Sequence, residues 1–179
     1  MSPLEIRRYP DPILRQISTS VEAKEIDTSL QNLIDNMAYT MYIFKGLGLA
    51  APQVGVLSRI ITVDTGEGLI ALVNPRILKG EGEEIGEEGC LSIPDIWLEI
   101  KRARKVIVDG MDRTGQKVLL EAEGLLARAF QHEIDHLNGV LIIDRVSHLQ
   151  RQLIESKLRR LRKEQGTLRP SSSNRKSFT

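Results

Sequence analysis

The sequence predicts an α+β domain, in which antiparallel strands pack around a central helix, with an amphipathic helix on its N-terminal side and a further helix at the C-terminal end. Three observations support this class. Apolar residues recur at helical spacing in three stretches, strand-like segments lie between the first two stretches, and short turns containing glycine join the strands. The order helix, strands, helix, helix is typical of an α+β domain with antiparallel hairpins.

The composition is that of one ordinary globular domain. The chain has 179 residues, of which 41% are apolar and 27% are charged, and this is enough for a sizeable core. No apolar run approaches the length of a membrane span, and the first residues lack the apolar segment of a secretory signal. We therefore expect a cytoplasmic protein that does not contact a membrane. The single cysteine, Cys90, excludes an intrachain disulfide and leaves a free thiol.

Charge is unevenly distributed along the chain. Residues 145–179 contain ten Lys or Arg against two Glu, a net charge of +8, so the preceding part carries 15 basic and 22 acidic residues, a net charge of −7. We divide the chain into a single domain over residues 1–165 and a polar basic tail over residues 166–179. The basic end is either a solvated surface or a binding site for an anionic partner.

The N-terminal part begins with a surface turn at residues 9–12, where two prolines interrupt regular structure. An amphipathic helix follows, which is predicted to begin near Asp27 or Thr28 and to stop at Gly46. Its apolar face consists of Leu30, Leu33, Ile34, Met37, Met41 and Phe44. We expect this face to pack on the core.

Residues 46–55 form a loop rich in small side chains, which let the backbone pass close to another group. A dinucleotide fingerprint needs a strand before such a loop and a helix after it. Here a helix precedes the loop, Pro52 interrupts it, and no Lys-Ser or Lys-Thr pair follows. The sequence therefore disfavours a nucleotide cofactor.

Two hairpins are predicted in the middle of the chain. The first joins strands at residues 59–64 and 69–74, with Pro75 ending the second of them. The second joins strands at residues 105–111 and 117–122.

An acidic, glycine-spaced extended stretch over residues 80–89 lies between the hairpins and leads to Cys90. The last helix is predicted at residues 147–164. Its apolar edge consists of Leu149, Leu153, Ile154, Leu158 and Leu161.

The central helix carries the pattern His-Glu-Ile-Asp-His over residues 132–136. Two imidazoles at i and i+4 lie one above the other on one face of a helix, which is a metal-ligand spacing. Leu125 and Ala129 share this face, so both histidines are expected to point inward. Glu133 is turned away from the ion but can reach a water bound to it, as a general base must. The helix is therefore predicted to bind a metal, and the following Asn-Gly pair ends it.

Two protein ligands do not hold a catalytic metal, so a third must come from elsewhere. The metzincin pattern fails, because Ile142 stands where its third His would lie. His148, Cys90 or a carboxylate remains. A thiolate is a strong ligand for a borderline metal, whereas we expect His148 to cap or precede the last helix.

Three motifs of the chain resemble those of peptide deformylases, in the family's order and at its spacing. They are Gly-Leu-Gly-Leu-Ala-Ala-Pro-Gln over residues 46–53, Glu-Gly-Cys-Leu-Ser over residues 88–92, and Gln-His-Glu-Ile-Asp-His-Leu-Asn-Gly over residues 131–139. The resemblance extends from the Pro-Asp-Pro turn to about residue 165. It implies the family's α+β fold and its reaction, which removes the formyl group from the N-terminal formylmethionine of new polypeptides.

The resemblance also implies roles for individual residues. Cys90, His132 and His136 would bind one divalent metal ion and leave a fourth position for water. The ion lowers the pKa of this water, and Glu133 takes its proton and later returns it to the leaving amine, so that a hydroxide attacks the formyl carbon.

An oxyanion hole is implied by the same resemblance. The side-chain amide of Gln53 and the backbone N–H of Leu91 would stabilise the charge on the formyl oxygen, each contributing on the order of 3 kcal/mol.

The substrate would lie against the glycine loop and the acidic stretch, where an extended peptide could add as a strand. Gly48 would let the peptide backbone approach, while Leu47, Leu125 and Arg128 would line the methionine pocket. The stem of Arg128 is expected to pack there with its charge pointing out to solvent; the alternative is a surface Arg with no part in the pocket. Trp97 either shapes the groove or belongs to the core.

The resemblance implies Fe(II) as the metal in the cell, with zinc or nickel replacing it in purified protein. Ligand type alone does not select iron, because two nitrogens and one sulfur suit zinc as well. The expected partners are nascent formyl-Met polypeptides and, through the basic C-terminal helix, the ribosome.

Two other functional classes remain open. A zincin-like metallo-endopeptidase would share the His-Glu-x-x-His pattern, but Asp135 is charged where zincins usually carry an uncharged residue. A non-catalytic metal-binding or RNA-binding module would have no use for Glu133 and Gln53.

Overall fold

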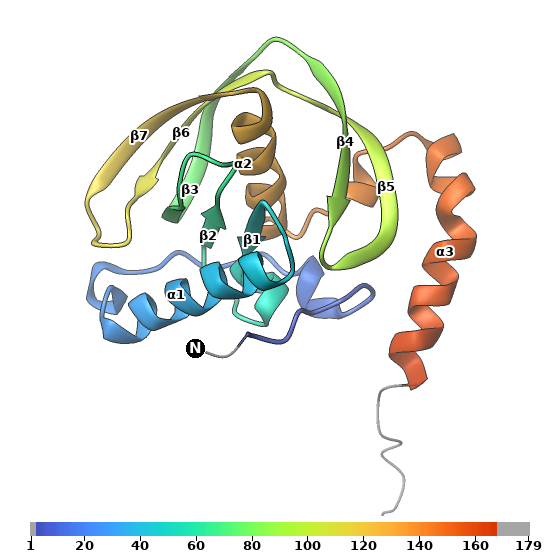
Figure 1. Ribbon diagram of the computed structural model, residues 1–179, viewed down its shortest axis with the longest axis horizontal. Helices are drawn as coiled ribbons and strands as arrows, with labels where there is room; N and C mark the ends of the chain where they lie inside the picture. The colour runs from blue at the N-terminus through green and yellow to red at the C-terminus, as the bar shows by residue number, and fades with distance from the viewer. Residues whose placement is uncertain (1–2, 168–179) are drawn as a thin grey trace, which may run out of the picture.

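Two antiparallel sheets and three α-helices build the computed structural model, which describes residues 3–167 (Figure 1). The larger sheet has the strand order β1-β2-β3-β6-β7, and the smaller sheet pairs β4 with β5. The strands are β1 (Gly48–Ala50), β2 (Ile60–Val63), β3 (Ile70–Glu81), β4 (Glu84–Cys90), β5 (Ile93–Arg102), β6 (Lys105–Met111) and β7 (Lys117–Glu123). The helices are α1 (Thr28–Ile43), α2 (Gly124–Leu137) and α3 (His148–Thr167). The predicted α+β class is confirmed.

Helix α1 begins and ends at local signals. The helix begins at Thr28 as predicted, and the carboxylate of Asp27 caps it by accepting a hydrogen bond from the Leu30 N–H at 3.0 Å. The helix ends before Gly46, because Lys45 adopts a left-handed φ of 56° and the Gly46 N–H bonds to the Met41 carbonyl at 2.9 Å.

Both predicted hairpins form, as the antiparallel pairs β2–β3 and β6–β7. The prediction that Pro75 ends the second strand is wrong, since β3 continues to Glu81. The pairing of β3 with β6 changes register between Val73 and Arg76, at the position of Pro75. A proline lacks a backbone N–H, and an irregularity in the pairing is where a sheet tolerates that loss.

The strands β1 and β5 were not predicted. Buried residues alternate along β5, at Ile96, Leu98, Ile100 and Arg102. This period of two is the signal of a strand with one buried face. The exposed Trp97 between Ile96 and Leu98 and the buried arginine at the fourth position obscure this alternation when only apolar residues are considered.

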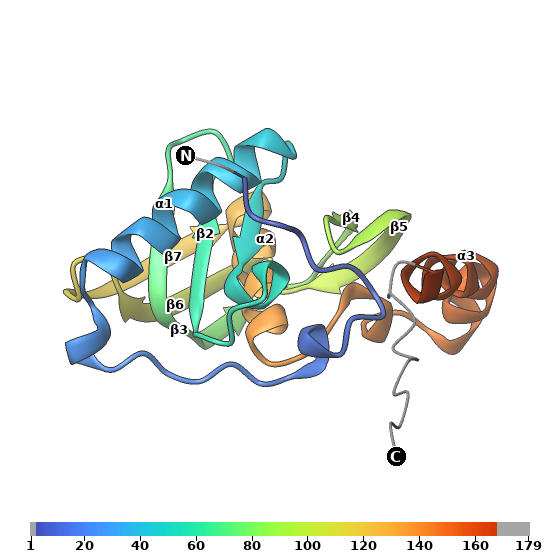
Figure 2. The same ribbon diagram turned by 90° about the horizontal axis from the view of Figure 1, so that it is seen from below.

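Helix α2 lies between the larger sheet on one side and the β4–β5 pair on the other (Figures 1 and 2). On the first side, Phe130, Ile134 and Leu137 of α2 share an apolar cluster with residues of the larger sheet, such as Val63 and Val108. A separate apolar cluster joins β5 to α3 and to the segment after α2. The core therefore has an apolar cluster on either side of the helix that carries the two histidines.

Helix α3 stands beyond β5, at the end of the molecule opposite α1 (Figures 1 and 2). Leu158 and Leu161 are buried against β5 and its neighbours, as predicted. Leu149 and Leu153 are 65% and 73% exposed, so the predicted apolar edge is buried only in the second part of the helix. Phe44, predicted on the inner face of α1, is also exposed.

The predicted tail lies mostly outside the described residues. Its first two residues, 166 and 167, continue α3, and residues 168–179 are not described. Within residues 3–167, no helix combines the length and the hydropathy needed to cross a membrane.

Candidate metal centre

Three potential metal ligands converge where the end of β4 meets α2. His132 and His136 stand one turn apart on α2, with their ring centroids 5.1 Å apart. Cys90 ends β4 and places its Sγ 3.3 Å from Nε2 of His136. The ligand atoms of the three residues all lie within 4.8 Å of one another. Of the three candidates for the third ligand, the structure places Cys90 beside the histidines, whereas His148 begins α3.

The inward direction of the two histidines is confirmed. His132 is 9% exposed and His136 is 1% exposed. The helix ends at the predicted Asn-Gly pair, where Gly139 has a φ of 71°. A Cβ at this glycine would meet the Arg15 carbonyl oxygen at 2.5 Å, so the sharp exit of the chain requires a glycine.

The surroundings of the two imidazoles shift their pKa values in opposite directions. Burial opposes a charge on both rings. For His132 the contacts with Cys90 and Glu88 outweigh burial and hold its pKa well above the usual value. For His136, burial and the neighbouring His132 hold the pKa well below it. The two shifts favour a proton on His132 and a neutral His136, and one metal ion shared by both rings would take the place of that proton.

The residues present fit a divalent metal ion. Two imidazole nitrogens and one thiolate are a frequent ligand set for zinc and related ions, with a fourth position left open in catalytic sites. Among residues 3–167, Glu133 Oε2 is a buried side-chain atom without a hydrogen-bond partner. A buried polar atom without a partner is costly, so Glu133 Oε2 marks a place where a further polar group is accommodated.

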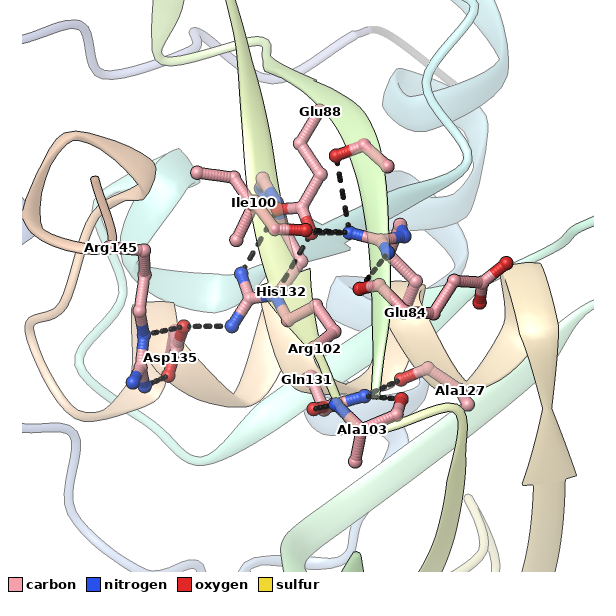
Figure 3. Close-up of polar contacts among 12 residues, drawn as sticks. Glu84, Glu88, Ile100, Arg102, Ala103, Ala127, Gln131, His132, Asp135 and Arg145 are labelled. Atoms are coloured by element: carbon pink, nitrogen blue, oxygen red, sulfur yellow. Dashed lines mark hydrogen bonds and ion pairs between the residues drawn. The ribbon is translucent and has the colours of Figure 1, made fainter. Parts of the chain in front are cut away.

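Glu88 opens the second motif, but the sequence assigns it no role of its own. Its Oε2 lies 3.0 Å from Nδ1 of His132, which leaves the other ring nitrogen to face the ligand cluster. Two nitrogens of Arg102 donate to this carboxylate at 2.9 and 3.0 Å (Figure 3). Burial raises the pKa of Glu88, but the hydrogen bonds from His132 and Arg102 outweigh it and hold the pKa well below the usual value. Glu88 is therefore a carboxylate that orients the ring of His132.

Asp135 has a structural role on the same side of α2. It accepts a hydrogen bond from Arg102 at 2.6 Å and one from Arg145 at 2.9 Å (Figure 3). The Asp135 charge, which disfavoured an endopeptidase, is thus paired with the buried Arg102 and with Arg145 at the surface. Glu88 and Asp135 share Arg102, so the carboxylates form one network.

Glu133 is held in a buried position next to the glycine loop. Burial raises its pKa to about 7, which is the range in which a carboxyl group both takes up and gives back a proton near neutral pH. A Cβ at Gly48 would lie 2.3 Å from Oε1 of Glu133. The glycine therefore makes room for the carboxylate.

Gln53 lies in a 3₁₀ turn (Ala51–Val54) that follows β1. Its Oε1 accepts the Ala50 N–H at 2.8 Å, which fixes the orientation of the amide. Its Nε2 therefore points to the site and lies 3.2 Å from Ser92 Oγ and 3.6 Å from Cys90 Sγ. An amide N–H thus faces the ligand cluster.

A cavity of about 480 Å³ opens beside the ligands. Its lining includes every residue predicted to contact the substrate, namely Leu47, Gly48, Leu125 and Arg128, together with Gln53, Leu91 and Trp97. Leu47 and Leu125 are each about half exposed, at 47% and 52%. Trp97 is 65% exposed, so it shapes the groove and does not belong to the core.

The expected direction of the Arg128 charge is wrong. Arg128 is only 7% exposed, so it is not a surface arginine either. Its guanidinium lies under β4 and donates to Glu88 at 2.9 Å and to the Glu84 carbonyl at 3.0 Å. The charge points inward because Gly86, which has no side chain, leaves a space for it between the strand and the helix.

Comparison with known proteins places this site in a family context. Residues 3–152 match the family model described as polypeptide deformylase. A peptide deformylase of Thermodesulfovibrio yellowstonii is 52% identical over 164 residues, which is 89% of this chain and 98% of that protein. A peptide deformylase of Halothermothrix orenii is 54% identical over 156 residues, 86% of this chain and 100% of that protein.

A solved structure is similar as well. The crystal structure of a peptide deformylase from Legionella pneumophila superimposes with a TM-score of 0.84 at 42% sequence identity. The match covers 94% of this chain and 100% of that chain. The fold, and not only the motifs, is therefore shared.

Proposed function

The chain belongs to the peptide deformylase family and is a hydrolase that removes the formyl group from the N-terminal methionine of nascent polypeptides, and we propose that Cys90, His132 and His136 hold its single divalent metal ion. The observation that carries this assignment is the approach of the three ligand atoms to within 4.8 Å of one another. We assign residues 1–165 to one catalytic domain, with a polar basic tail over residues 166–179.

The metal supplies chemistry that side chains lack: when bound, a divalent ion lowers the pKa of water and polarises a carbonyl oxygen. We propose Fe(II) in the cell and zinc or nickel in protein purified in air. The ligand set of two nitrogens and one sulfur accommodates each of them.

Glu133 is the proton carrier in this proposal. It takes the proton of the attacking water and delivers it to the amine that leaves when the bond between the formyl carbon and the nitrogen breaks. The products are formate and a free N-terminus. Its buried position and a pKa of about 7 support both halves of this role, because the carboxyl group exists in either protonation state near neutral pH.

Gln53 and the backbone N–H of Leu91 stabilise the charge that develops on the formyl oxygen. The amide of Gln53 is already oriented by its bond to Ala50, so little reorganisation is needed. Preorganised donors of this kind contribute on the order of 3 kcal/mol each to lowering the barrier.

The peptide lies along β4 as an added strand. Within residues 3–167, β4 pairs with β5 alone, which leaves one edge for a further strand. The methionine side chain enters the cavity against Leu47, Leu125 and the stem of Arg128, while Gly48 allows the peptide backbone to approach. Because methionine is long and flexible, a mostly apolar cavity of this kind suits it.

Helix α3 is proposed to contact the ribosome, where the substrate emerges. It carries Lys157, Arg159 and Arg160 on its exposed side, and cations on one face bind the phosphates of RNA. We therefore also propose that the enzyme acts in the cytoplasm. Binding of the full chain to ribosomes should weaken steeply as salt is raised from about 50 to 200 mM.

Formate release tests the proposed function directly. Protein purified without oxygen is expected to release formate from formyl-Met-Ala-Ser, and Glu133→Gln should lower the rate about 10²- to 10⁴-fold while the protein still retains one metal ion. Metal analysis of the same sample identifies the ion. Cleavage of internal peptide bonds without formate would instead indicate the endopeptidase, and metal binding without any turnover would indicate a non-catalytic module.

A further inference from the structure

The proposed metal ligands come from two parts of the molecule that share neither a sheet nor an apolar core. Cys90 ends β4 in the smaller sheet, whereas His132 and His136 lie on α2. Among residues 3–167, the two sheets are separate, although β4 and β5 run on from the paired strands β3 and β6 after a short interruption. Apolar residues of β5 cluster with α3, while those of α2 cluster with the larger sheet. A two-stranded sheet has little stability of its own beyond the strands that it continues, so its contacts with α2 help to set its distance from the helix.

Arg128 makes the most extensive of these contacts. From α2, its guanidinium donates to the carbonyl oxygens of Glu84 at 3.0 Å, Ile100 at 2.9 Å and Gly86 at 3.4 Å. It also donates to the Glu88 carboxylate at 2.9 Å. All four acceptors belong to β4 or β5. The planar, multiply bonded guanidinium therefore fixes both the distance and the orientation of the strand pair relative to the helix.

Gly86 is the feature of β4 that admits this arginine. An added Cβ at this position would lie 2.9 Å from Arg128 Cζ and 2.9 Å from its Nη2. A glycine inside a strand weakens the strand, and it often marks a place where another group approaches the backbone closely. The glycine and the arginine therefore form a matched pair.

The contact with Glu88 extends the effect of Arg128 to the histidines. Glu88 lies on β4, two residues before Cys90, and its other oxygen is 3.0 Å from His132 Nδ1. Arg102 on β5 binds the same carboxylate and also Asp135 on α2. The strand pair and the helix are thus joined by a charged network that contains one ligand-orienting carboxylate.

We propose that Arg128 is a positioning residue, which fixes β4 and β5 on α2 and thereby sets the distance of Cys90 from His132 and His136. This proposal rests on the ligand set of the proposed function. Arg128 acts through the strand and through Glu88, and its guanidinium reaches no reacting atom. Its stem lines the cavity, but its charged end serves the geometry of the metal centre.

Metal release and the spectrum of the cobalt-substituted enzyme test the proposal. Arg128→Met keeps the stem and removes the guanidinium. We expect it to release Zn²⁺ to a chromogenic chelator about 10- to 100-fold faster than the wild-type protein. A loss of this size is typical when a group that orients a metal ligand is removed. The absorption bands of the Co²⁺-loaded variant should also shift, because they report the arrangement of the sulfur and nitrogen ligands. A loss of global stability alone does not shift them in a folded sample.

A second variant and a control isolate the effect. Gly86→Ala displaces the guanidinium without removing it, so it should speed Zn²⁺ release in the wild-type background and have no further effect in the Arg128→Met background. Phe130→Leu lowers stability from the opposite side of α2 and should release Zn²⁺ at the wild-type rate with an unchanged Co²⁺ spectrum.

The outcomes separate this proposal from the proposed function. Wild-type protein that binds no metal would overturn the ligand set itself. Wild-type protein that binds metal, together with an Arg128→Met variant that has the wild-type release rate and spectrum, would overturn only the positioning role. If Arg128→Met does not fold, Gly86→Ala alone decides: an unchanged release rate and spectrum overturn the proposal, and faster release with shifted bands supports it.

Discussion

Helix α2 meets its two neighbours through contacts of opposite character. Towards the larger sheet it presents Phe130, Ile134 and Leu137, which are buried among apolar side chains. Towards β4 and β5 it presents charged and polar groups, of which His132 and Asp135 are bonded to Glu88 and Arg102 (Figure 3). The same helix is thus held by non-directional packing on one side and by directional hydrogen bonds on the other.

The two sides of α2 therefore contribute differently to the stability of the protein and to the geometry of the site. Apolar burial contributes roughly in proportion to area and tolerates small shifts. Buried ion pairs add little net stability, because the cost of desolvation offsets the attraction between the charges, but they fix positions and are expensive to break from one side. We infer that packing on the larger sheet stabilises the helix, and that the charged side sets the geometry of the metal ligands.

Removing Glu88 should give the largest effect of any single change on the charged side. Glu88→Ala leaves Arg102 and Arg128 buried beside each other without the carboxylate that both bind. We expect a loss of about 3–5 kcal/mol in the free energy of unfolding, measured in urea, and metal affinity lowered about 10- to 100-fold. A variant with wild-type affinity would contradict the role assigned to the charged side.

A steric change next to Glu133 should affect the reaction more than the fold. Gly48→Ala would place a methyl group 2.3 Å from Oε1 of Glu133, so the carboxylate must move. Displacement of a reacting group by about 1 Å costs on the order of 10²-fold in rate. The formate assay should show this loss, whereas Zn²⁺ retention should remain near the wild-type level. Loss of metal together with activity would mean that the glycine loop supports the ligands as well.

The apolar side offers the complementary test. Phe130→Leu removes buried surface facing the larger sheet, and we expect the free energy of unfolding to fall by about 0.5–3 kcal/mol. Because no metal ligand or charged partner is touched, the rate of Zn²⁺ release from the folded protein should not change. Faster metal release from this variant would show that the two sides of α2 are not independent.

Elements with local signals could be predicted from the sequence. Asp27 caps α1 through its own side chain, and Gly139 ends α2 through a φ that favours glycine, so the residues nearby suffice. The i, i+4 spacing likewise places His132 and His136 together on any helix. For Cys90 the residues alone left alternatives, and the resemblance to a family selected it.

The parts that depend on distant partners could not be predicted. Arg102 is separated from Glu88 by 14 residues and from Asp135 by 33, and only the unpredicted strand β5 brings it to both. The predicted direction of the Arg128 charge is wrong because the periodicity of a helix carries no information about a space left by a neighbouring strand, here β4. Gly86 supplies that gap, and its role appears only when the two elements are placed together.

The smallest effect should come from an ion pair at the surface. Asp144 pairs with Arg15, and the two side chains are 32% and 40% exposed. Water therefore screens this interaction, whereas it does not reach the buried Glu88. Burial raises the pKa of Asp144, but the hydrogen bond and charge of Arg15 and the N–H of Leu141 outweigh it, and the pKa is lowered from 3.8. A lowered pKa means that the stabilisation is present above pH 3.8 and is lost as the pH falls through the folded-state value.

Asp144→Asn should therefore lower the free energy of unfolding by about 1 kcal/mol or less at pH 7. Urea titrations should show that the difference from the wild-type protein shrinks below about pH 4. If Asp144→Asn lowered the free energy of unfolding as much as Glu88→Ala, or by an amount independent of pH, surface and buried charges would not differ as we propose.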